Sequence, residues 1–181
     1  MNHPSGISRT LLVLTAAACL WVTQTPGAVA DTAAFPDQQN DAPPNTDIER
    51  VRVANKQRII VNVLFDNLRR NSGGLSVYYD TRGTDPGPEY LATGGLFPGT
   101  DFQMSRIERW NDRNPELLIG CDLKMRVDYA KDKATFDVAR GCIESAGEPK
   151  RIRVAAKSTS QDNSERDWAP QRRRFYDWVQ R

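Results

Sequence analysis

The sequence predicts an all-β protein, an antiparallel β-sandwich of the jelly-roll or immunoglobulin-like kind with about eight strands and one disulfide. In several short segments, apolar residues alternate with polar ones, as they do in strands with one buried face. These segments recur at regular spacing between turn-forming Gly, Pro, Asn and Asp residues, which is typical of sandwiches and small barrels. No long segment has a helical period with helix caps.

The expected strands begin near residue 48. Residues 48–54 and 58–65 form a predicted hairpin around the turn Asn55-Lys56-Gln57, with every second residue of the second strand apolar. The clearest hairpin joins the predicted sixth and seventh strands around Ala130-Lys131-Asp132. The strands expected after the first two are 75–81, 90–93, 101–110, 122–128, 133–139 and 152–156.

The first residues of the chain are typical of a secretory signal peptide. The apolar stretch 11–22 is followed by Ala28-Val29-Ala30, a sequence that suits cleavage after residue 30. The stretch has about 12 residues, fewer than the roughly 20 that cross a bilayer. We therefore expect residues 1–30 to be removed and the protein to be secreted or extracytoplasmic, without a membrane span. Lipid attachment through Cys19 is the alternative.

The predicted mature chain has a tether and one folded domain. Residues 31–46 are polar, contain several prolines and have neither a helical nor a strand period, which predicts a flexible linker. The single sandwich domain is expected to span residues 47–181. The 25 Lys and Arg residues of the chain nearly balance the 23 Asp and Glu residues, so the net charge does not call for a nucleic-acid partner.

Cleavage would remove the only histidine, His3, and one of the three cysteines. Cys121 and Cys142 remain and are expected to form a disulfide, because oxidising compartments favour it and the bond would join the open ends of the second hairpin. Without imidazole, Ser-His-Asp and Cys-His catalysis and His-ligated zinc are excluded. Carboxylate chemistry, a Ser-Lys pair and binding without catalysis stay open.

Acidic residues gather in a Gly- and Pro-rich segment and shortly after it. Asp80, Asp85, Glu89 and Asp101 are candidate calcium ligands, because Ca²⁺ binds carboxylate and carbonyl oxygens. No other cofactor is expected. The alternative is that these acids form turns and that Arg82 neutralises one of them. Three of them, Asp80, Glu89 and Asp101, also supply the carboxylates for a hypothetical glycan hydrolase.

Aromatic and basic residues form a second candidate site near the C-terminus. Exposed aromatic rings suit sugars, and arginines beside them suit anionic polymers or phosphates. In the alternative interpretation, Trp168, Phe175 and Trp178 anchor the terminal segment on the sandwich while the arginines stay solvated. The candidate binding residues are Trp110, Trp168, Arg172, Arg173, Tyr176 and Trp178.

Several segments resemble a group of small exported actinobacterial proteins without assigned activity. The resemblance rests on V-R-V-A-N-K-Q-R-I-I-V, on D-T-R-x-x-x-P-G-P-E-Y from Asp80 to Tyr90, on the G-T-D that ends at Asp101, on the cysteine-flanked hairpin, and on R-D-W ending at Trp168. More distantly, the strand order is similar to carbohydrate-binding and haem-binding sandwiches of the DOMON type. Haem ligation there uses Met and His, and the missing histidine argues against it.

These observations favour one function over two others. We expect an exported, non-enzymatic sandwich that binds a cell-envelope or extracellular ligand, with a glycan as the preferred candidate. The first alternative is the carboxylate-based glycan hydrolase. The second is a protein that binds a partner chain through an exposed edge strand.

Overall fold

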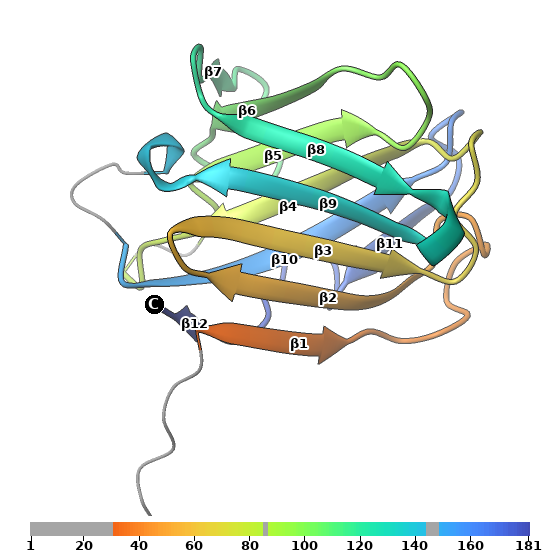
Figure 1. Ribbon diagram of the computed structural model, residues 1–181, viewed down its shortest axis with the longest axis horizontal. Helices are drawn as coiled ribbons and strands as arrows, with labels where there is room; N and C mark the ends of the chain where they lie inside the picture. Colours follow the sequence, from red (N-terminus) through yellow and green to blue (C-terminus); the bar gives the residue numbers. More distant parts are fainter. Residues whose placement is uncertain (1–30, 85–86, 144–148) are drawn as a thin grey trace, which may run out of the picture.

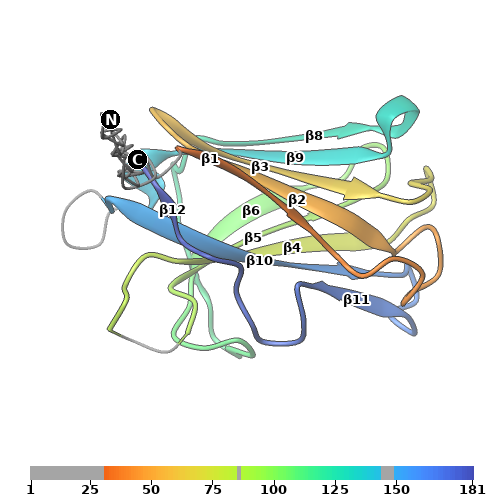
Figure 2. The same ribbon diagram turned by 90° about the horizontal axis from the view of Figure 1, so that it is seen from below.

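The computed structural model describes residues 31–84, 87–143 and 149–181, and in this part of the chain two antiparallel sheets pack face to face (Figures 1 and 2). One sheet has the strand order β1-β2-β3-β9-β8 and the other β11-β10-β4-β5-β6-β7, with β12 paired to β10. The predicted all-β sandwich is confirmed. The predicted signal peptide, with Cys19, and Asp85 lie outside the described residues.

The strand bounds follow the sheets. The first sheet contains β1 (Thr32–Pro36), β2 (Ile48–Asn55), β3 (Arg58–Phe65), β9 (Lys133–Ala139) and β8 (Leu123–Asp128). The second contains β11 (Arg166–Ala169), β10 (Arg151–Thr159), β4 (Gly74–Asp80), β5 (Tyr90–Gly95), β6 (Phe102–Arg106) and β7 (Glu116–Leu117), with β12 (Val179–Gln180) beside it. Two short 3-10 turns, η1 (Tyr129–Lys131) and η2 (Arg140–Cys142), flank β9.

The core lies between the sheets and follows the predicted alternation. Val61 and Val63 of β3 are fully buried, as are Val77 and Tyr79 of β4 in the opposite sheet. Both predicted hairpins are present, β2 with β3 and β8 with β9. In the second hairpin the turn is closed by Asp132, whose φ of 47° lies in the left-handed region. Period-two patterning was therefore a sound guide to the strands with one buried face.

The prediction that residues 31–46 form a flexible linker is wrong. This segment contains β1, which pairs along its whole length with β2, and the side chains of Ala33 and Phe35 pack against the core. The connection that follows includes Thr46, whose side chain is fully buried. A five-residue edge strand with small residues and a terminal proline has too few apolar positions to show a period. The short strands β7, β11 and β12 escaped prediction for the same reason.

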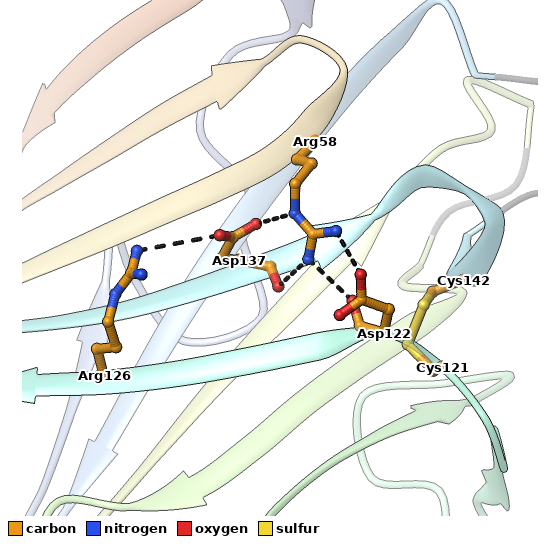
Figure 3. Close-up of polar contacts among 6 residues, drawn as sticks. All are labelled: Arg58, Cys121, Asp122, Arg126, Asp137 and Cys142. Carbon is orange, nitrogen blue, oxygen red and sulfur yellow. Dashed lines mark hydrogen bonds and ion pairs between the residues drawn. A yellow bond between two sulfur atoms is a disulfide. The ribbon is translucent and has the colours of Figure 1, made fainter.

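The predicted disulfide is confirmed: Cys121 and Cys142 are bonded, with their Cα atoms 5.2 Å apart. Beside it, Arg58 of β3 joins Asp137 of β9 to Asp122, the residue before β8 (Figure 3). Its Nη1 donates to Asp122 Oδ2 at 2.6 Å, and its Nε donates to Asp137 Oδ1. The disulfide and this arginine therefore hold the same end of the first sheet.

No helix among the described residues is long and apolar enough to cross a membrane.

Candidate ligand-binding face

The outward face of the second sheet carries a straight row of polar side chains that ends in a tryptophan. The register pairs Trp168 of β11 with Lys157 of β10, Lys157 with Ser76 of β4, Ser76 with Thr93 of β5, and Thr93 with Gln103 of β6. Because side chains alternate between the two faces of a strand, the neighbours of these residues face the core. The row crosses five strands.

A groove of about 440 Å³ lies over the middle of this row, where Lys157, Ser76 and Thr93 line it. Ser76 and Thr93 contribute hydroxyl groups to it, Lys157 an amine and Asn163 an amide. Glycines at the ends of β4 and β5 keep its floor low; a side chain at Gly95 would collide with the ring of Phe97 and with Thr100 Oγ1. The groove is therefore shallow, polar and bordered by an aromatic ring at one end.

Lys157 sets the charge of the groove. Partial burial lowers the pKa of its amine, and the positive charge of Arg166 lowers it further. The amine lies 5.7 Å from the centre of the Trp168 ring, within the range of a cation–π contact. No carboxylate is among the described residues that line the groove. The arrangement suits a ligand that offers hydroxyl, carbonyl or anionic groups.

Aromatic side chains cover the neighbouring part of the same face. Tyr78 stacks on Trp168, with ring centres 5.5 Å apart, and contacts Trp110 at 5.0 Å. Phe175 from the C-terminal segment packs on Trp110 at 4.5 Å. Tyr78 is only 5% exposed, whereas both tryptophans are half-buried. Trp110 and Trp168 thus anchor the C-terminal segment and still present part of their surface.

Of two further predicted binding residues, Tyr176 lies outside this aromatic layer, and Trp178 is linked to it through Arg153, whose guanidinium carbon is also 4.9 Å from the ring centre of Phe175. Tyr176 stacks on Phe35 of β1, with ring centres 4.6 Å apart, and packs against the main core. Trp178 lies under Arg151 and Arg153, whose guanidinium carbons are 4.4 and 4.6 Å from its ring centre. Both rings attach the end of the chain to the sandwich, and the structure does not bring them together with Trp168.

The two predicted arginines belong to the exposed turn between β11 and β12. Arg172 and Arg173 are exposed, and Arg173 has a φ of 59°. Neither of them is among the described residues that line the groove. Of the six residues predicted to bind a ligand, only Trp168 is paired directly with a groove residue.

The acids predicted to bind calcium do not form one site in the described residues. Asp80 is fully buried and accepts a hydrogen bond from Arg153 Nε at 2.6 Å. Glu89 lies next to it and accepts a hydrogen bond from the Thr81 amide at 2.7 Å. Burial raises the pKa of both carboxyls. Asp101 is exposed and lies at the opposite end of β5 from Glu89.

No protein-family model and no curated protein matches the chain. The candidate site therefore depends on geometry. Sequence reasoning missed the groove because Ser76, Thr93 and Lys157 belong to three separate segments. The available signal was their position: Ser76 and Thr93 belong to the predicted strands 75–81 and 90–93, and Lys157 directly follows the predicted strand 152–156. Only the register shows that these places are neighbours.

Proposed function

We propose that the protein is an exported, non-enzymatic β-sandwich that binds an extracellular or cell-envelope glycan in the groove over β4, β5 and β10. The observation that carries this proposal is the row formed by Ser76, Thr93 and Lys157 with Trp168 at its end. The disulfide supports export, because such bonds persist in oxidising compartments.

The chemistry of the row matches a sugar. Each hydroxyl group in the groove can donate and accept a hydrogen bond, and the Lys157 amine donates up to three. A pyranose ring presents hydroxyls around its edge and C–H groups on its faces. Its edge therefore needs polar partners, and one of its faces needs an apolar surface. The partly exposed ring of Trp168 supplies that surface. The groove volume also falls within the range of small-molecule sites.

Binding is favoured over hydrolysis by the positions of the carboxylates. A glycosidase uses two carboxyl groups about 5 to 10 Å apart on either side of the scissile bond. The described lining of the groove offers none. Asp80 and Glu89 are neighbours, but Asp80 is fully buried and paired with Arg153, so it does not face a substrate.

The test is binding to a panel of purified cell-wall and extracellular polysaccharides. Replacing Thr93→Val and Lys157→Met removes polar partners while keeping similar side-chain size, and each change is expected to weaken binding about tenfold, as loss of one good hydrogen bond does. Lys124→Met, on the exposed edge strand β8 of the other sheet, is the matched control and should bind like the wild type.

Two results would contradict the proposal. One is binding that Thr93→Val and Lys157→Met leave unchanged while circular dichroism shows both variants folded. The other is hydrolysis of a panel member that Glu89→Gln abolishes without unfolding the protein, because this would favour the carboxylate-based enzyme. Stoichiometric co-purification of a protein in place of a glycan would favour binding through an edge strand.

A further inference from the structure

Aspartates from distant parts of the sequence meet where the β1–β2 connection passes β11. Asp41 and Asp47 belong to that connection, and Asp167 belongs to β11. One carboxylate oxygen from each of the three lies within 4.8 Å of the others. Figure 2 shows the orange connection beside β11 at one end of the sandwich. This cluster is separate from the groove and from the acids that the sequence singled out.

Asp47 has an oxygen without a partner inside this cluster. Its side chain is only 2% exposed, and its Oδ1 is buried and accepts no hydrogen bond from any described donor. Leaving a buried carboxylate oxygen without a donor or a cation costs several kcal/mol in general. A positively charged ligand at this point would remove that cost.

Backbone amides hold two other oxygens of the cluster in place. The Ile48 amide donates to Asp167 Oδ2 at 2.7 Å, and the Asn40 amide donates to Asp47 Oδ2 at 2.8 Å. The first of these bonds joins the two sheets. These amides orient two carboxylates but do not neutralise them, and no Lys or Arg of the described residues forms an ion pair with any of the three acids.

We propose that Asp41, Asp47 and Asp167 bind one divalent cation and that calcium is the preferred ion. Calcium accepts six to eight oxygen ligands in flexible geometry, and carboxylates can bind it through one or both oxygens. Asp41 is exposed, which gives the ion a route from solvent, while Asp47 and Asp167 are buried and fixed. Water would complete the coordination at the exposed side. Magnesium is disfavoured because it demands near-ideal octahedral geometry.

The cation would cross-link the two sheets. Asp167 belongs to β11, and the next residue is Trp168, which flanks the groove. An ion bound to Asp167 and to the β1–β2 connection would therefore hold β11 against the first sheet. The cation site stands independently of the proposed glycan function, because its argument uses no residue of the groove.

The experiment uses the full chain, stripped with EDTA and dialysed, and measures thermal unfolding and isothermal titration with CaCl₂ or MgCl₂. We expect one calcium ion per chain with a Kd of about 10⁻⁴ to 10⁻³ M, the range of extracellular calcium modules. The Tm should rise clearly at 10 mM CaCl₂, a concentration about ten to a hundred times that Kd. Magnesium should raise the Tm less.

Asp41→Asn is the decisive variant because its side chain is exposed and its replacement removes one negative charge from the cluster. In EDTA the Tm of the variant should equal or exceed that of the wild type, and in CaCl₂ the wild type should have the higher Tm. The variant should bind calcium at least tenfold more weakly. Asp101→Asn, an exposed acid from the set first predicted to bind calcium, is the control and should behave like the wild type.

The proposal is overturned if calcium neither binds nor raises the Tm of the wild type, which would mean that the acids share a proton. It is also overturned if Asp41→Asn and the wild type respond equally to calcium, or if Asp101→Asn alone loses the response.

Discussion

Replacing both disulfide cysteines by alanine should lower the free energy of unfolding by about 3 kcal/mol. Cys121 and Cys142 are 21 positions apart, and the entropy that a cross-link of this span removes from the unfolded chain corresponds to about 3.3 kcal/mol at 25 °C. For a domain of this size each kcal/mol shifts the Tm by about 2 to 4 °C, so the variant should melt roughly 7 to 13 °C below the wild type.

The assay is urea unfolding of the double variant and the wild type, followed by tryptophan fluorescence and circular dichroism. The variant should still fold, because Arg58 ties Asp122 and Asp137 together next to the lost bond (Figure 3). Its m-value should rise, since the unfolded chain becomes more expanded. A loss below about 1 kcal/mol would refute the entropic reasoning. A variant without cooperative unfolding would refute the claim that Arg58 maintains this end of the sheet.

Three further predictions concern buried polar groups. Arg153→Met should lower the free energy of unfolding in urea by about 3 to 5 kcal/mol, because it leaves the buried Asp80 carboxylate without its cation. Adding Asp80→Asn should recover part of this loss. A double variant whose loss equals the sum of the two single losses would contradict the coupling between the two residues. Burial, with neighbouring carboxylates, raises the pKa of Asp37 to about 7 and that of Asp167 to about 6. The folded protein therefore holds protons on these groups that the unfolded chain releases near pH 4, so in EDTA the Tm should fall as the pH rises from about 5 to about 7.5. A Tm that rises over this range would contradict the prediction. Tyr79→Phe should be neutral or stabilise the protein by about 1 kcal/mol in thermal or urea unfolding, because its buried hydroxyl has no partner among the described residues, and a large loss would reveal one.

The sequence was most informative where one face of a strand is buried. In β3 every second side chain enters the core, so periodicity alone identified the strand and its hairpin partner. It failed at β1, where Ala33 and Phe35 give only two inward positions beside a proline. The disulfide was predictable because the predicted removal of residues 1–30 left a single pair of cysteines, and hairpin geometry placed that pair together.

The candidate sites were harder to predict because they depend on contacts between distant segments. Asp47 and Asp167 are separated by most of the chain, and they meet only because β11 lies beside the β1–β2 connection. The C-terminal aromatics showed the opposite problem: Trp168 and Tyr176 are close in sequence but lie in different clusters, because the chain turns between them. Proximity in sequence suggested one aromatic site where the fold has two.

The most direct test of the proposed function is an NMR titration. The backbone amide signals of the protein are assigned and then followed as the panel polysaccharide that binds the protein is added. The proposal predicts that the amides of Ser76, Thr93 and Lys157 shift together and saturate with a single affinity. Shifts confined to the pocket around Glu89 and Arg82, or scattered along the strand edges with the groove unchanged, would contradict it.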